Sequence, residues 1–197
     1  MTKSPLLSIM LVAALPLAGC ISFGATPPDT LLTLNSTVAL PVGQAQNSAT
    51  AKSIVIAVPV TPQSLATTRV PVQTSATSIA YVKEAQWAEP PARLFARLMS
   101  DTVTARTGRV VLGQVQAVTE ANDQLAGELR NFGLDADARV AVVTFDAALT
   151  RSGATGTEKR RFEARVPVTA IDAVSAGPAL NQAANQVAQQ VADWVGR

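Results

Sequence analysis

The chain of 197 residues contains no histidine and only one cysteine, Cys20. Histidine is the most common general base and the most common metal ligand, so its absence argues against acid–base catalysis and against a metal centre. Charged residues make up only 15% of the chain, and the net charge is +2. A nucleic-acid-binding protein needs a basic surface, which this near balance does not provide. The composition therefore favours neither an enzyme nor a nucleic-acid-binding protein.

The first twenty residues have the order of features found in an export signal. Lys3 precedes an apolar segment at 6–17, which is too short to span a bilayer as a helix. The small residues Ala18 and Gly19 follow it, as in the cleavage region of a secretory signal peptide. A lone cysteine in an exported protein has no disulfide partner, so we expect Cys20 to have another use.

The sequence Leu17-Ala18-Gly19-Cys20 resembles the bacterial lipobox, in which the cysteine becomes the first residue of the mature chain. The resemblance implies a diacylglycerol thioether on Cys20, and usually a further acyl chain such as palmitate on its amine. One acyl chain anchors a protein only marginally, whereas two or three hold it on the membrane. Two alternatives stay open: an ordinary signal peptide in which Cys20 is incidental, or an inert cysteine buried in a cytoplasmic domain.

These features divide the chain into three parts. Residues 1–19 are expected to form a lipoprotein signal peptide, and 20–28 a lipidated tether. The remainder, 29–197, is long enough for a single domain with its own core. Ile21 follows the cysteine where an aspartate would favour the inner membrane in enteric-type sorting, so the resemblance implies a periplasm-facing protein of the outer membrane.

Two amphipathic helices and several strands are predicted for this domain. The first helix begins at Pro90-Pro91 and ends at Gly108, and the second begins near Gly177-Pro178. Pro71 is expected to place its strand at the edge of a sheet. The predicted strands are 53–60, 68–74, 78–82, 109–112, 123–135, 138–150 and 157–168, with a weaker candidate at 29–36 and a loop at 37–53. This order predicts an α+β fold, in which two main helices cover one face of a mixed, mainly antiparallel sheet.

The segment YVKEAQWAEPP, followed by RLFARLMSDTVTARTG, resembles the ABC-type transport auxiliary lipoprotein component family, which includes the PqiC-like lipoproteins. The lipobox, the SIVIAVPV, RVPV and SIAYV segments and the final Ala/Val-rich helix follow in the expected order. The Gln/Asn/Ser/Ala-rich stretch before Ser53 matches no feature of the family.

This resemblance implies a lipid-anchored, non-catalytic accessory subunit that tethers or docks the conduit of an MCE-associated lipid transport system. The implied partners are an MCE-domain protein, an ABC permease with its ATPase, and the membrane itself. No cofactor is expected besides the covalent lipid on Cys20. The chain has no G-x-x-x-x-G-K-[ST] loop of its own.

Two aromatic residues in that segment are candidates for a docking surface. Tyr81 and Trp87 belong to residue types that often anchor interfaces. The alternative is that Trp87 packs over the start of the first helix and that Tyr81 ends a strand.

Three charged groups have both a functional and a structural interpretation. Glu89 could act as a functional carboxylate, or as a favourable negative charge at a helix N-terminus. Asp135 and Asp137 could form a carboxylate pair, or simply favour a turn. The run at 159–161 could contact anionic lipid headgroups, or line a solvated hairpin.

Other functions are compatible with an anchored α+β domain. The main alternative is an envelope lipoprotein that serves as an assembly factor or activator of cell-wall or outer-membrane biogenesis. A second is a carrier that encloses acyl chains in an apolar cavity. An enzyme is the least favoured, because the chain offers no histidine and no free thiol besides Cys20.

Overall fold

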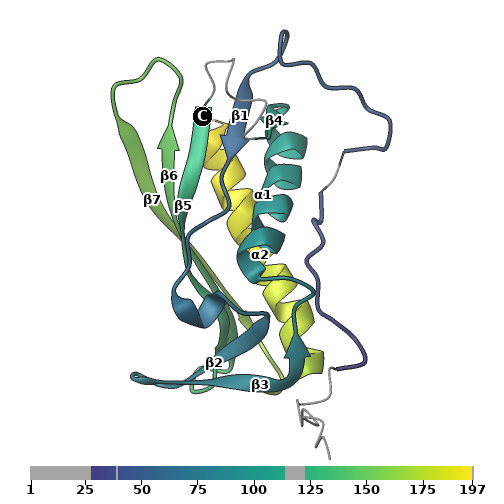
Figure 1. Ribbon diagram of the computed structural model, residues 1–197, viewed down its shortest axis with the longest axis vertical. Coiled ribbons are helices and arrows are strands. Elements are labelled where there is room, and N and C mark those ends of the chain that lie inside the picture. The colour runs from purple at the N-terminus through teal and green to yellow at the C-terminus, as the bar shows by residue number, and fades with distance from the viewer. Residues whose placement is uncertain (1–27, 39, 114–122, 197) are drawn as a thin grey trace, which may run out of the picture.

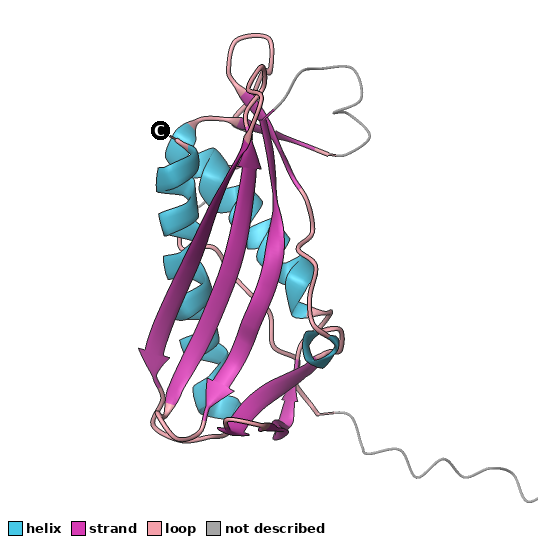
Figure 2. Cartoon of the chain, turned by 90° about the vertical axis from the view of Figure 1, so that its left-hand side faces the viewer, coloured by secondary structure: helices cyan, strands magenta, loops and turns pink. Residues whose placement is uncertain are grey.

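The computed structural model describes residues 28–38, 40–113 and 123–196, which form two layers. One layer is a mixed seven-stranded sheet, and the other consists of two helices that cover one of its faces (Figure 2). The helices are α1 (Pro91–Thr107) and α2 (Ala173–Val195). The strands are β1 (Ser53–Ile56), β2 (Arg69–Ser75), β3 (Ser78–Gln86), β4 (Val110–Leu112), β5 (Asp123–Asp135), β6 (Val140–Thr150) and β7 (Thr157–Pro167), with a short 3-10 helix, η1, at Gln63–Leu65. The predicted α+β fold is confirmed.

Strand β5 organises the sheet. One of its edges pairs antiparallel with β6 along its whole length, and β6 pairs in the same way with β7. The other edge pairs in parallel with β1 near the start of β5 and with β2 near its end. The sheet therefore forks on this side: β1 pairs with β4 at one end, and β2 pairs with β3 at the other (Figure 1).

The position of Pro71 corrects the prediction that β2 lies at an edge. β2 lies between β3 and β5, and β3 is the outer strand. Two local features accommodate a residue that has no N–H group to donate. The pairing with β5 begins only at Val72, and the ladder with β3 shifts register between Arg69 and Pro71. A proline is tolerated at such an irregularity as well as at an edge.

Strand β7 shows the predicted alternation of buried and exposed side chains. Phe162, Ala164 and Val166 are buried on the side that faces the helices. The charged residues between them are exposed on the open face of the sheet. Because successive side chains of a strand point to opposite faces, a charged face and an apolar face result.

Helix α1 begins and ends as predicted. Pro91 occupies its first turn, where a missing N–H costs little, and Gly108 follows it with a left-handed φ of 68°. The N–H of Gly108 donates to the carbonyl of Thr104 at 3.0 Å. The predicted apolar stripe is buried along its whole length: Leu94, Phe95, Leu98, Met99, Thr102 and Val103.

Helix α2 begins four residues earlier than predicted. Asp172 is its N-cap, and the side chain of this residue accepts a hydrogen bond from the N–H of Ser175 at 2.8 Å. Gly177 and Pro178 therefore lie inside the helix instead of starting it. Pro178 leaves the carbonyl of Val174 without its helical donor, but Val174 is exposed and water can replace that donor.

The predicted strand at 29–36 is reduced to one bridge, and the chain continues along α2. Leu32 pairs with the end of β3 through its N–H, which donates to the carbonyl of Gln86 at 2.7 Å. Residues 31–38, which we call the N-terminal strap, then run beside the helix (Figure 1). The N–H groups of Asn35 and Thr37 donate to the side-chain oxygens of Asn181 and Asn185 at 2.9 and 2.8 Å.

We expect Gly127→Ala to destabilise the fold. A Cβ at Gly127 would lie 2.3 Å from the carbonyl oxygen of Asp146 and 2.7 Å from the ring of Phe145. The backbone of β6 would have to move, so the free energy of unfolding should fall by about 1–3 kcal/mol. Urea unfolding followed by tryptophan fluorescence measures this change.

The matched control is Gly156→Ala, because a Cβ there meets nothing within 4 Å. It should unfold within about 0.5 kcal/mol of the unmodified chain. Equal stabilities for the two variants would contradict the close packing of β5 on β6.

Candidate functional site

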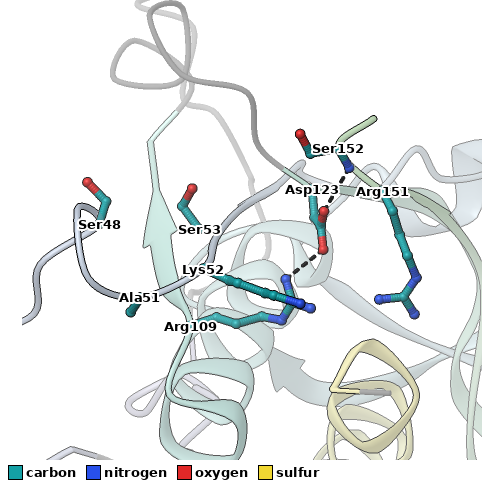
Figure 3. Close-up of a pocket in the computed structure, with 8 residues that line it drawn as sticks. All are labelled: Ser48, Ala51, Lys52, Ser53, Arg109, Asp123, Arg151 and Ser152. Carbon is teal, nitrogen blue, oxygen red and sulfur yellow. Dashed lines mark hydrogen bonds and ion pairs between the residues drawn. The ribbon is translucent and has the colours of Figure 1, made fainter. Parts of the chain in front are cut away.

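A polar cavity lies at the end of the molecule where both helices finish. It has a volume of about 410 Å³ and is bounded by the starts of β1 and β5 and by the turn after β6. Its charged residues lie near one another in Figure 3, with Asp123 between Arg109 and Ser152. The lining residues are Ser48, Ala51, Lys52, Ser53, Arg109, Asp123, Arg151 and Ser152.

The centre of this cavity is a buried ion pair. Nη1 of Arg109 lies 2.6 Å from Oδ2 of Asp123, and the two side chains are only 7% and 12% exposed. The other carboxylate oxygen, Oδ1, accepts a hydrogen bond from the N–H of Ser152 at 2.8 Å. Both oxygens of Asp123 are therefore engaged, as a buried carboxylate requires.

Arg109 and Arg151 also bind the last carbonyl groups of α2. Nη2 of Arg109 donates to the carbonyl of Val195 at 3.2 Å, and Nη1 of Arg151 donates to it at 3.3 Å. Nη2 of Arg151 also reaches the carbonyl of Trp194 at 3.4 Å. The last carbonyls of a helix lack partners within the helix and carry partial negative charge, so positive groups there are favourable.

This arrangement is suited to holding elements together. Arg109 follows α1, Asp123 begins β5 and Val195 ends α2, so one group of polar contacts joins three elements. Small-molecule sites usually have mainly apolar walls. Here the cavity contains a charged pair whose groups are already bound to each other and to the end of α2. Sequence reasoning missed this site, because neither residue stands in a motif and their partners come from distant positions.

The open face of the sheet carries an array of exposed ion pairs. Arg161 makes two hydrogen bonds to Asp146, at 2.6 and 2.7 Å, and they lower the pKa of that carboxyl. Arg165 donates to Glu163 at 2.8 Å and lowers its pKa in the same way. A shallow hollow of about 620 Å³ beside these pairs is lined in part by Lys159. Exposed pairs of this kind contribute little to stability.

Trp87 is unavailable as an interface residue in this structure, because its side chain is fully buried. Its ring meets that of Phe132 edge-on at a centroid distance of 5.4 Å, and Phe132 in turn contacts Phe95. Among the described residues, no acceptor faces the indole Nε1. Trp87 is therefore a core residue, in agreement with the packing interpretation. Its burial does not agree with the docking interpretation.

Tyr81 lies within β3 and is partly buried. The guanidinium carbon of Arg69 lies 3.9 Å from the centre of its ring, a cation–π contact between the two strands of the hairpin. Tyr81 therefore does not end its strand, which continues to Gln86. Its role at an interface stays a prediction.

Two of the acidic candidates, Glu89 and Asp135, have structural partners. Glu89 pairs with Arg97 on the surface, and this hydrogen bond lowers the pKa of its carboxyl. Asp135 accepts a hydrogen bond from the N–H of Ala138 at 2.9 Å and so closes the turn between β5 and β6. In the part of the chain that the structure describes, no group of three or more aspartate, glutamate, histidine or cysteine side chains could hold a metal ion.

Cys20 and the residues Leu17, Ala18 and Gly19 lie outside the described residues, so lipidation stays a prediction. Within residues 28–38, 40–113 and 123–196, neither helix is long and apolar enough to cross a membrane.

Comparisons with known proteins identify relatives of this fold. The model of the ABC-type transport auxiliary lipoprotein component family matches residues 33–192. A crystal structure of a Xanthomonas campestris protein, placed in the family DUF330, superposes with a TM-score of 0.68 at 19% identity, over 84% of this chain and 94% of that one. A second crystal structure, of an uncharacterized protein, gives 0.64 at 16% identity, over 84% and 99% of the two chains. No curated protein matches the sequence.

We expect Arg109→Met to destabilise the protein strongly. The variant keeps much of the side-chain volume but leaves the buried carboxylate of Asp123 without its cation. Removing one member of a buried ion pair costs about 3–5 kcal/mol, and adding Asp123→Asn should recover part of this loss. Urea unfolding of the three proteins measures both effects.

Arg106→Met is the matched control, because Arg106 pairs with Asp193 at the surface with side chains 37% and 53% exposed. It should cost less than about 1 kcal/mol. A similar loss at positions 106 and 109 would show that burial of the Arg109 pair has no special importance.

Proposed function

Since this chain belongs to the ABC-type transport auxiliary lipoprotein component family, we propose that it is a lipid-anchored accessory subunit that tethers or docks the conduit of an MCE-associated lipid transport system. In this proposal the acylated Cys20 holds the domain at the periplasmic face of the outer membrane. The domain itself is non-catalytic, and a separate ATPase subunit supplies the energy.

Family membership supports the coarser part of this proposal. It indicates a lipoprotein of the bacterial envelope that serves an ABC-type transport system. The MCE-domain partner, lipid as the transported molecule and the outer membrane as the location extend beyond what the family description says.

The observation that carries the tethering mechanism is the attachment of the N-terminal strap to α2. Asn185 is 3% exposed, and its amide both accepts from Thr37 and donates to the carbonyl of Asn35 at 2.9 Å. The hydroxyl of Ser36 lies 3.2 Å from that of Thr102 on α1. The chain is thus joined to both helices soon after the expected tether, so an anchor on Cys20 would hold the whole domain close to the bilayer.

The length of the tether limits how far the domain can lie from the bilayer. The eight links from Cys20 to Pro28 span at most about 29 Å even when fully extended. Confinement to so thin a layer raises the local concentration of the domain near a partner in the same membrane. A weak protein–protein contact would then suffice for docking.

The structure gives less support to a carrier that encloses acyl chains. Such a carrier needs a cavity with apolar walls. Five of the nine residues that line the hollow on the open face of the sheet are charged, and the cavity at the end of the helices is mainly polar. Between the helices and the sheet, side chains form a continuous core.

We expect Cys20→Ser to release the protein from the membrane and to abolish its support of transport. The substitution removes the thiol that would carry the lipid. Fractionation should find the variant among soluble periplasmic proteins, and a strain that depends on it should show the defect of the deletion strain.

Crosslinking of the intact lipoprotein should recover MCE-domain and permease subunits.

The control joins residues 29–197 to the signal peptide and lipidated tether of an unrelated outer-membrane lipoprotein, which should restore function. A soluble Cys20→Ser variant that is fully active at normal abundance would contradict tethering as the mechanism.

A further inference from the structure

The domain exposes apolar side chains at the end from which the chain leads back to Cys20. We propose that Leu31, Ile171 and Val174, which we call the anchor-end patch, rest in the interfacial layer of the bilayer that holds the lipid anchor. This inference deepens the proposed function and rests on the lipidation of Cys20.

All three side chains are exposed. Leu31 is 52% exposed, Val174 84% and Ile171 36%. Leu31 begins the N-terminal strap, Ile171 directly precedes the N-cap of α2, and Val174 lies in the first turn of that helix. Exposed apolar side chains that gather at one end of a domain indicate a surface that contacts a membrane or another molecule.

Contacts between the strap and α2 bring these residues together. Leu32 passes over Gly177, where even a single added Cβ would lie 2.9 Å from its Cδ2 atom. Val174 lies three residues before Gly177, on the same side of the helix. Leu31 adjoins Leu32, and Ile171 directly precedes the N-cap Asp172. The patch therefore surrounds the place where the strap meets the first turns of α2.

The patch lies within reach of the bilayer. The described chain begins at Pro28, three residues before Leu31, at the end of the molecule opposite the C-terminus (Figure 1). Since the tether from Cys20 to Pro28 spans at most about 29 Å, this end can touch the membrane without any other element moving. An anchored surface needs little affinity of its own, because the lipid already confines it there.

Charges beside the patch limit how deep it can lie. Asp29 is exposed, and hydrogen bonds from Ser175 at the start of α2 lower the pKa of Asp172, which favours its charged form. Burial of a charge in hydrocarbon is costly. Contact at the headgroup layer keeps these carboxylates in water while the apolar side chains leave it.

Two other candidates for membrane contact, Val60 and the basic run at 159–161, lie far from the anchor. Val60 is 67% exposed, but its N–H donates to the carbonyl of Gly127, eight residues before the end of β5. That offset corresponds to about 26 Å along the strand. The basic run at 159–161 lies at a similar distance from Pro167, the end of β7. Neither reaches the bilayer together with the anchor-end patch.

The test places a fluorescent probe in the patch of the lipidated chain. Because the lipid occupies the thiol of Cys20, Val174→Cys introduces the one free thiol, and it can carry an environment-sensitive nitrobenzoxadiazole group. The protein is reconstituted in vesicles of phosphatidylethanolamine and phosphatidylglycerol that contain spin-labelled phosphatidylcholine as a quencher. Gly156→Cys, in the exposed β6–β7 turn, carries the same probe as the matched control.

We expect at least threefold stronger quenching at position 174 than at position 156. Leu31→Gln with Ile171→Gln should lower the quenching at 174 to the level of the control. Val58→Gln with Val60→Gln should leave it unchanged, since these exposed valines lie away from the patch.

Equal quenching at 174 and 156, in protein that floats with the vesicles, would overturn the patch but leave the anchor intact. Protein that fails to float would overturn the anchor and the patch together. These outcomes separate a failure of this inference from a failure of the proposed function.

Discussion

One constraint shapes this molecule: a long, strongly twisted sheet has one apolar face, and the helices must cover it. β5 has 13 residues and β6 and β7 have 11 each, so these strands extend for about 36–43 Å. α2 has 23 residues, which corresponds to about 34 Å. A single helix can therefore cover most of the length of β6 and β7, and α1 covers the part of the sheet near β1 and β4.

The composition of α2 suits this task. Its buried face contains many alanines, which let the helix lie close to the strands, and larger side chains fill the remaining space. At the far end Trp194 meets Phe162 of β7 with ring centroids 5.5 Å apart. At the other end a leucine of the strap takes the place of a side chain at Gly177. The helix is thus packed between the sheet on one side and α1 and the strap on others.

Local patterns made much of this fold predictable. The alternation of β7 and the apolar stripe of α1 each follow from the period of one element, and Gly108 marks a helix end by its own conformation. The predicted start of α2 lies four residues too late because Gly177-Pro178 resembles a helix start, although Asp172, an aspartate before a helix, is itself a signal. Pro71 was misleading for a different reason: its neighbours in the sheet are set by pairing with β5, which no local pattern encodes.

The candidate sites also differ in whether a local pattern identifies them. Cys20 could be identified because its motif is contiguous, and it stays a prediction. The burial of Trp87, the ion pair of Arg109 with Asp123 and the patch around Val174 each depend on residues brought together from distant positions. Aromatic type alone could not separate a core residue from a surface one, because both uses favour large rings.

The N-terminal strap has a mechanical consequence. A pull on the chain upstream of Pro28 is not applied to the edge of the sheet alone, since beyond the single bridge at Leu32 the strap is bound to α2 through Asn181 and Asn185. The strap runs along the helix axis, so these hydrogen bonds resist such a force side by side, in shear, and cannot open one after another like a zipper. Tension between a membrane and the domain would thus be transmitted to the longest helix, and through it to the whole core.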